Sequence, residues 1–236
     1  MQVKEGASHI HKGFGGTGGL SSGKGHQPSP GLNSKQLRVE FNIPKNYLDC
    51  FYPPEKRAEI TKLSIVSKNL TGELDLSDFV NLEKLNCSYN YELSSLNLSN
   101  CLRLKKIECI HNSQLTNLTF PINLTNLKKL RLIYSSLEQN LSFLTGAVNL
   151  KELDLRDNKF TGSLDYLSNL KKLEYLDISS TDINEVNIDK LPKSLKCIAY
   201  STTKSPHCQL TSITLQLEKC KYAFCQKCQQ PNTSED

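Results

Sequence analysis

Tryptophan is absent from the sequence, methionine occurs once in 236 residues, and hydrophobic residue types make up only 37% of it. This fraction is low for a compact globule. No apolar run approaches the roughly 20 residues that a helix needs to cross a bilayer, which argues against a membrane-spanning segment. The first residues also lack the apolar stretch of a secretory signal. We therefore expect a cytoplasmic protein with no membrane association.

Strong charge is missing as well. The net charge of +5 reflects a mild excess of lysine, which does not predict nucleic-acid binding. The nine cysteines are an odd number in a chain without an export signal, so free thiols or metal ligands are favoured over disulfides. For the same reason, we attribute the seven N-x-S/T triplets to an asparagine-rich composition rather than to glycosylation. They begin at Asn69, Asn86, Asn97, Asn117, Asn123, Asn140 and Asn232.

Large apolar side chains are scarce in residues 1–36, a stretch rich in glycine, serine and proline. Such a segment buries too little surface to offset its ordering entropy, so we expect a disordered leader. Its GGTGGLSSGKG sequence looks superficially like a phosphate-binding loop. The spacing does not fit, because Gly25 rather than serine or threonine follows Lys24, and no strand precedes the loop.

A repeat of 22 or 23 residues occupies the chain from Ile60 onward. Segments such as LEKLNCSYNYEL, LKKLRLIYSSL and LKELDLRDNKF follow the pattern L-x-x-L-x-L-x-x-N-x-L, which is typical of leucine-rich repeats. The copies begin at Ile60, Leu82, Leu104, Leu127, Leu150, Leu173 and Leu195.

The pattern has a direct physical meaning. Its last two leucine positions alternate with polar ones, as a short strand with one buried face requires. Cys87 and Cys109 fill one of these positions, where a free cysteine acts as a small hydrophobe. The asparagine position suits a turn, since its side-chain amide can bond neighbouring backbone. We expect an irregular asparagine ladder where other residues take this position. These are Lys68, Ser135, Thr181 and Thr203.

Each coil can bury its leucines only against its neighbours. The copies therefore predict an α/β solenoid: a curved leucine-rich repeat of about seven coils with a parallel β-sheet on the concave face. Terminal coils need covers, and the sequence predicts a short helical cap broken at Pro53-Pro54 and an amphipathic C-terminal cap. The expected units are a leader (1–36), an N-terminal cap (37–59), the repeats (60–205), a C-terminal cap (206–224) and a truncated cysteine-rich tail (225–236).

The sequence DLSDFVNLEKLNCSYN, followed by LNLSNCLRLKKIEC, resembles the leucine-rich repeat family expanded in arbuscular mycorrhizal fungi. The resemblance covers roughly residues 47–233 and includes the entry segment YLDCFYPPEKRAEITKL. Many relatives couple such repeats to a tyrosine-kinase-like protein kinase, near two C-x-x-C pairs. Cys225 and Cys228 resemble the first pair, and the second pair is missing. No V-A-I-K, H-R-D or D-F-G motif occurs, so the resemblance implies a recognition module rather than an enzyme.

Metal chemistry is one possible use of the last cysteines. Structural zinc takes four tetrahedral ligands, commonly from two C-x-x-C pairs. Cys225 and Cys228 form one pair, and Cys208 and Cys220 could complete the set at an irregular spacing. Exposed thiols are the other interpretation, and apart from zinc we expect no cofactor. No histidine is combined with a nucleophile and an acid in a way that predicts catalysis.

The outward positions of the predicted strands identify a candidate partner-binding face. They bring aromatic and apolar residues of successive coils together beside arginine, and such clusters mark interaction sites. Lysines flank one half of this face and carboxylates the other, so we expect it to bind a protein or peptide. The alternative is that the charges only solvate the surface and the rings pack against one another. The candidate residues are Tyr89, Ile110, His111, Arg131, Ile133, Tyr134, Arg156 and Asp157.

Three functions remain open from the sequence. The first is a non-enzymatic interaction module in signal transduction or scaffolding. The second is the regulatory part of a kinase whose catalytic domain lies beyond Asp236, which the downstream coding sequence would reveal. The third is a zinc-dependent scaffold, which metal analysis with and without Cys225 and Cys228 would test.

Overall fold

The computed structural model describes residues 41–200. It contains most of the predicted N-terminal cap and one strand from each repeat. The predicted leader, C-terminal cap and cysteine-rich tail lie outside the described residues. So do the four candidate metal ligands, Cys208, Cys220, Cys225 and Cys228.

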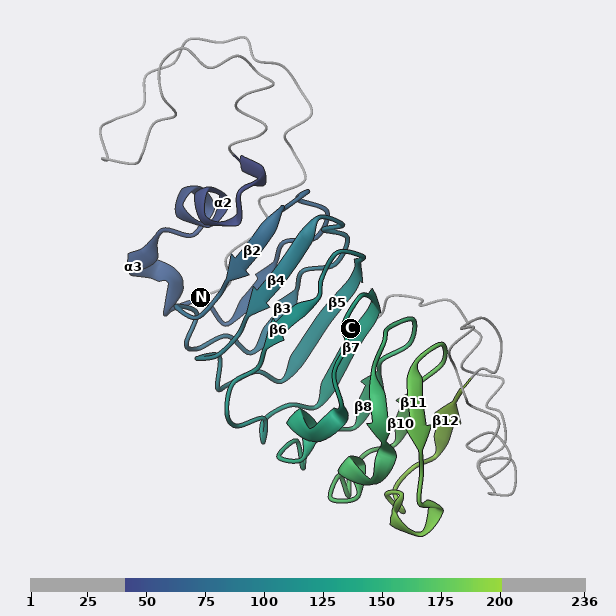
Figure 1. The fold of residues 1–236 in the computed structure, drawn as a ribbon. Coiled ribbons are helices and arrows are strands. Elements are labelled where there is room, and N and C mark those ends of the chain that lie inside the picture. Colours follow the sequence, from purple (N-terminus) through teal and green to yellow (C-terminus); the bar gives the residue numbers. More distant parts are fainter. Residues whose placement is uncertain (1–40, 201–236) are drawn as a thin grey trace, which may run out of the picture.

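A parallel sheet of seven strands forms one face of the molecule, with one strand from each repeat (Figure 1). Successive repeats are neighbours in the sheet, and their leucine positions pair in register, as Leu63 does with Leu85 and Leu85 with Ile107. The chain thus winds as a solenoid, whose coils we number from Ile60, and the predicted fold is confirmed. The strands are β1 (Lys62–Ser64), β3 (Lys84–Asn86), β5 (Lys106–Asn112), β7 (Lys129–Ser135), β8 (Glu152–Asp154), β10 (Tyr175–Asp177) and β12 (Cys197–Ala199).

The opposite, convex side of each coil consists of short strands and single 3-10 turns. A coil of 22 or 23 residues leaves little length there, and 3-10 helices are used in such short pieces. Within residues 41–200, α-helix is confined to the N-terminal cap. The convex elements are β2 (Gly72–Asp75), β4 (Leu93–Asn97), β6 (Asn117–Thr119), η1 (Leu141–Leu144), β9 (Thr161–Ser163), η2 (Leu164–Leu167), β11 (Asp182–Glu185) and η3 (Ile188–Lys190).

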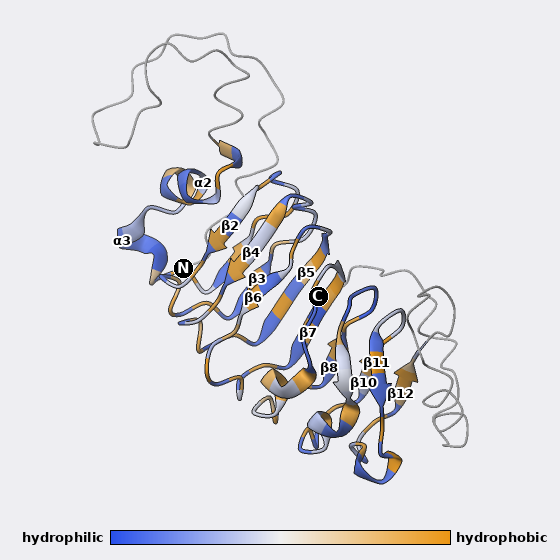
Figure 2. Ribbon diagram, viewed as in Figure 1, coloured by the Kyte–Doolittle hydropathy of each residue, from blue (hydrophilic) through white to orange (hydrophobic). Residues whose placement is uncertain are grey.

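Leucines stacked from coil to coil fill the space between the two sides. In Figure 2, apolar and polar residues alternate along the strands, as expected when one face of each strand is buried. Fully burying one leucine contributes about 1.5–3 kcal/mol, and the repeats place this contribution at the same positions in every coil. Cys87 and Cys109 are fully buried among them. A hydrogen bond with Cys109 and burial raise the pKa of Cys87 well above its usual range, so this thiol stays neutral in the core.

A buried asparagine ladder holds the turn that follows the strands. The Asn90 amide donates to the carbonyls of Ile65 and Cys87, both at 2.9 Å, and its oxygen accepts from the Leu70 N–H at 3.1 Å. One side chain thereby satisfies backbone groups of two coils. In coil four Ser135 takes this position, and its buried hydroxyl has no hydrogen-bond partner within the part of the chain that the structure describes. The predicted irregularity of the ladder is confirmed there.

A second set of asparagines caps turns on the convex side. Asn97, Asn123 and Asn140 each accept a hydrogen bond from the backbone N–H two residues later, at 3.0, 2.9 and 3.0 Å. This is the Asx-turn, which Asn and Asp side chains form readily. Asn86, on the sheet side, accepts the same kind of bond at 3.1 Å. Four of the N-x-S/T triplets therefore begin with a turn-forming asparagine, which gives the asparagine-rich composition a structural cause.

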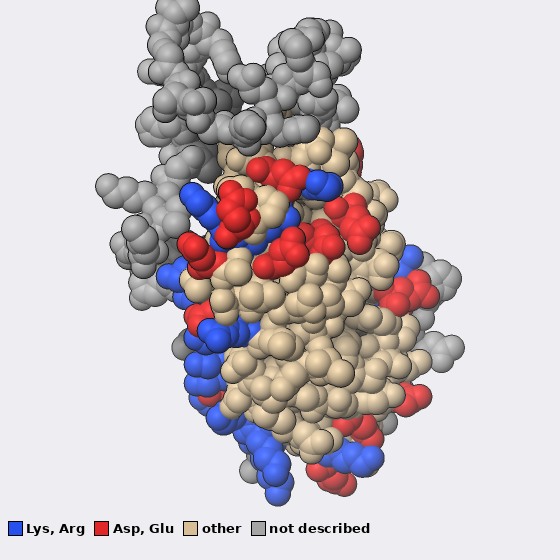
Figure 3. Space-filling model, turned by 90° about the vertical axis from the view of Figure 1, so that its left-hand side faces the viewer, with Lys and Arg blue, Asp and Glu red and all other residues tan. Residues whose placement is uncertain are grey.

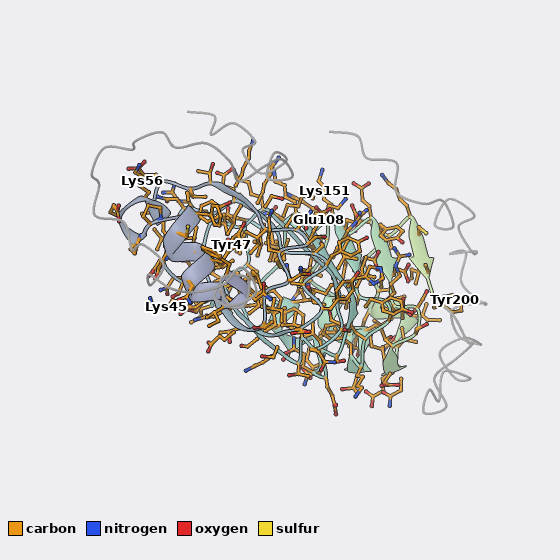
Figure 4. All side chains as sticks on the ribbon, turned by 90° about the horizontal axis from the view of Figure 1, so that it is seen from above. Lys45, Tyr47, Lys56, Glu108, Lys151 and Tyr200 are labelled. Atoms are coloured by element: carbon orange, nitrogen blue, oxygen red, sulfur yellow. The ribbon has the colours of Figure 1, made fainter. Side chains whose placement is uncertain are left out.

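The N-terminal cap consists of α2 (Pro44–Phe51) and α3 (Pro54–Arg57), separated at the prolines. In Figure 4, Tyr47 points from α2 into the solenoid, whereas Lys45 and Lys56 point away from it. Arg57 is buried and connects the cap to the first coils. Its guanidinium binds Asp49, binds Asp78 at 3.0 Å, and lies 5.8 Å from the centroid of the Phe79 ring.

Candidate partner-binding face

Three aromatic side chains form a row along one edge of the seven-stranded sheet. This aromatic row consists of Tyr89, His111 and Tyr134, at the same position of coils two, three and four. The ring centroids of Tyr89 and His111 are 5.1 Å apart, and those of His111 and Tyr134 are 4.9 Å apart. Tyr89 and Tyr134 are nevertheless 39% and 53% exposed. The rings thus pack against one another, as one alternative predicted, and the two tyrosines still remain partly exposed to solvent.

Tyr91 extends this exposed aromatic surface. It is missed from the sequence when only the outward positions of the predicted strands are considered. Its ring lies edge-on to Tyr89, with 6.4 Å between centroids, and it is 52% exposed. The sequence signal was available, because Tyr91 follows the buried Asn90 of the repeat directly.

Every residue of the aromatic row has a left-handed backbone conformation, with φ of 62°, 56° and 55°. The same position is left-handed in the other described coils with complete turns, where it holds Ser67, Asp157 or Ser180. This conformation costs a residue with a Cβ atom about 1–2 kcal/mol, and Asn and Asp tolerate it best. The coil geometry therefore requires the conformation but not the ring, since serine occupies the position in two coils.

The two isoleucines predicted beside the row are less accessible than expected. Ile110 is half-buried, and Ile133 is buried, with 5% of its surface exposed. Ile133 pairs in register with Ile110 and lies on β7 between Arg131 and Tyr134. The expectation that Ile133 belongs to an exposed apolar cluster was therefore wrong. Alternation along a strand assigns a residue to a face, but long neighbours can cover it there.

Ion pairs cross the sheet face in coils three to five. Arg131 lies between two glutamates, 2.6 Å from Glu152 and 3.8 Å from Glu108. Lys106 binds Glu108 at 3.0 Å, and Lys129 binds Glu152 at 2.9 Å. The predicted division into a basic half and an acidic half therefore does not hold in these coils, because the charges neutralise one another within and between neighbouring strands.

Two carboxylates of the predicted acidic half are withdrawn from solvent. Asp154 and Asp177 pair in register and are 2% and 3% exposed. Arg156 lies 3.3 Å from Asp154 and 3.5 Å from Asp177. Burial, and then the charge of Asp177, raise the pKa of Asp154 to about 7 against the opposing effect of Arg156. Asp157 is half-buried beside them, and burial raises its pKa as well.

Between residues 41 and 200, no group of three or more His, Cys, Asp or Glu side chains could hold a metal ion. A strongly shifted pKa often marks a catalytic group. Asp154, however, is closed to solvent and shares one guanidinium with Asp177, which is the arrangement of a buried ion pair. The same part of the chain contains no helix with the length and apolar character needed to cross a membrane.

A family model described as Leucine Rich repeats (2 copies) matches residues 148–193. Among solved structures, the leucine-rich repeat ectodomain of the receptor kinase SOBIR1 from Arabidopsis thaliana is 20% identical, with a TM-score of 0.38 over 59% of this chain and 67% of that one. The LRIM1/APL1C complex is 22% identical, with a TM-score of 0.47 over 63% of this chain and 31% of that one. The functional domain of InlJ from Listeria monocytogenes is 16% identical, with a TM-score of 0.36 over 61% and 49%. No curated protein matches the chain.

The chain thus spans less than half the length of the last two structures. At these TM-scores, none of the three likenesses supports a statement about partners or activity. The repeat period, the matched family model and the seven-stranded parallel face together show that the described repeats fold as a leucine-rich repeat solenoid.

Proposed function

We propose that the protein is a non-enzymatic, cytoplasmic interaction module that binds a protein or peptide on its sheet face, with the aromatic row at the centre of the interface. Leucine-rich repeat solenoids offer extended surfaces that mediate protein–protein interaction. Tyrosine and arginine are enriched among residues that dominate binding energy. Arg131, Arg156 and Asp157 flank the row as polar contacts, and Ile110 adds apolar surface. Ile133 is buried and does not contact the partner.

Partly exposed aromatic rings in successive coils, at a position where serine suffices for the fold, carry this proposal. Three successive coils hold bulky rings in a backbone conformation that Asn or Gly adopts with less strain. Coils one and six show that serine suffices for the fold. The left-handed conformation itself recurs in coils without a ring, so the rings, and not the backbone strain, distinguish this part of the face. Partial exposure of the rings agrees with a surface that a partner covers.

The double variant Tyr89→Asn/Tyr134→Asn separates binding from folding. We expect its melting temperature to stay within a few degrees of the wild type, because asparagine relieves backbone strain while ring packing is lost. Partner proteins captured from cell lysate by the wild type should be lost with the variant, and purified partners should show the same loss. Two matched controls should retain them: Ser67→Asn/Ser180→Asn, at the same coil position, and Tyr166→Asn, an exposed tyrosine of η2. Equal capture by the folded double variant and the wild type would remove the row from the interface.

The same face would serve as the recognition part of a larger protein. The C-x-x-C pair at Cys225 and Cys228, which resembles the stretch near the kinase junction of the fungal family, supports this arrangement. The coding sequence that follows Asp236 tests it. A kinase domain in frame supports the arrangement, and a stop codon there eliminates it.

A further inference from the structure

Four lysines lie side by side across the first four strands of the sheet face. This lysine column consists of Lys62, Lys84, Lys106 and Lys129, which pair in register along β1, β3, β5 and β7. Neighbouring strands are about 4.8 Å apart, and like charges directly opposite one another destabilise a sheet. In Figure 3, basic side chains form a line down one edge of the molecule.

Only two of the four lysines in this column have their positive charge neutralised by a glutamate. Lys106 and Lys129 have glutamate partners at 3.0 and 2.9 Å. Lys62 and Lys84 are exposed, and no carboxylate of residues 41–200 lies within salt-bridge distance of either ammonium group. The next outward residues on their strands are Ser64 and Asn86, where β5 has Glu108. Positive charge therefore remains concentrated at coils one and two.

We propose that the partner segment bound by this face is an extended acidic peptide whose carboxylates lie over Lys62 and Lys84 while an apolar side chain contacts the aromatic row. This inference rests on the proposed function. Lys84 and Tyr89 are five residues apart, from the start of β3 to the turn beyond it, so up to about 16 Å separates their backbones. A small anion cannot bridge that distance, whereas a peptide of a few residues can. The peptide would then form salt bridges with Lys62 and Lys84 and contact the exposed surface of the rings at the same time.

Single-stranded nucleic acid is the competing polyanion, since it combines phosphates with bases that stack on aromatic rings. The aromatic row disfavours it. Its rings already stack on one another at 5.1 and 4.9 Å between centroids. A base would have to separate these stacked rings in order to stack within the row, whereas a peptide side chain can contact their exposed surface without moving them.

Fluorescence anisotropy with three labelled probes of equal length tests the proposal: a peptide of alternating Glu and Leu, one of alternating Lys and Leu, and oligo-uridine. We expect binding of the Glu-Leu peptide only, weakening as salt is added. Lys62→Ser/Lys84→Ser should weaken it at least tenfold. The control Lys171→Ser/Lys193→Ser removes the same charge from exposed lysines away from the face and should bind as the wild type does. Equal weakening in both variants, no preference for the acidic peptide, or tighter binding of oligo-uridine would overturn the proposal.

The variant Tyr89→Asn/Tyr134→Asn distinguishes the two failures. If it binds the Glu-Leu peptide normally while the lysine variant does not, the acidic site stands and the aromatic row is not part of the interface. If it loses binding while the lysine variant retains it, the row stands and the acidic preference is wrong.

Discussion

Replacing Asp154 with asparagine removes a carboxyl group whose ionised form is disfavoured in the folded protein. Asp154 is 2% exposed, faces Asp177 on the next strand, and shares Arg156 with it. Its pKa is about 7 in the folded chain, whereas the ordinary pKa of an aspartate side chain is 3.8. Because the folded state holds the proton more tightly, this group stabilises the fold most below about pH 4. That contribution falls as the pH rises and is lost above about pH 7.

This pKa difference corresponds to a change of about 4 kcal/mol in the contribution of Asp154 to the free energy of unfolding between about pH 4 and about pH 7. Folded domains are stable by only about 5–15 kcal/mol, so the effect is measurable even if relaxation of the site removes half of it. We expect Asp154→Asn to raise the free energy of unfolding at pH 8 by about 2–4 kcal/mol and to flatten its dependence on pH between 5 and 8.

Urea denaturation at pH 5, 6, 7 and 8 measures this. Four carboxyl groups whose pKa values are lowered by lysine or arginine partners do not interfere, because they lose their contribution only below about pH 4.5. They are Asp49, Glu83, Asp165 and Glu174. The exposed Asp189→Asn is the control and should follow the wild-type curve. A wild-type free energy of unfolding that rises from pH 5 to pH 8, or a loss of stability in Asp154→Asn at pH 8, would show that the ionised Asp154 side chain does not destabilise the fold.

Three further perturbations test other parts of the structure. Ser135→Asn restores the buried ladder in coil four and should raise the free energy of unfolding by about 1 kcal/mol in urea denaturation; a loss would show that the site has no room for the amide. Arg57→Ala removes the buried guanidinium between the cap and the first coils and should lower the free energy of unfolding by about 2 kcal/mol or more. Lys45→Ala, in an exposed pair, should lower it by less than about 0.5 kcal/mol. Equal effects of the two variants would contradict the role of Arg57. If the last cysteines bind zinc, purified protein should contain the metal and lose it in Cys225→Ser/Cys228→Ser; protein isolated without zinc under metal-replete conditions would contradict that site.

The seven strands could be predicted from sequence because each one repeats a spacing that has a single physical reading. A pair such as Leu85 and Cys87 must point to the same side of a strand, and only stacking against the next coil buries both. The asparagine ladder followed from the same logic, and so did its interruption at Ser135.

Side-chain environment on the sheet face could not be predicted in the same way. The sequence placed Asp154 and Ile133 on an outward face, yet both are buried there, because their accessibility depends on neighbours from other coils. The pairing of Arg131 with Glu108 and Glu152 depends on which rotamers meet between strands. The left-handed conformation at Tyr89 also carries no residue signature, since serine, aspartate and histidine occupy the same position elsewhere.

Photo-crosslinking tests directly whether a partner binds at the aromatic row. Tyr134→p-benzoylphenylalanine places a crosslinker at the aromatic row, and Tyr166→p-benzoylphenylalanine places one on the convex side. After irradiation of cells that express each full-length variant, we expect a discrete crosslinked partner from position 134 and none from position 166. A partner crosslinked from position 166 alone, or no crosslinked partner from position 134, would contradict binding at the aromatic row.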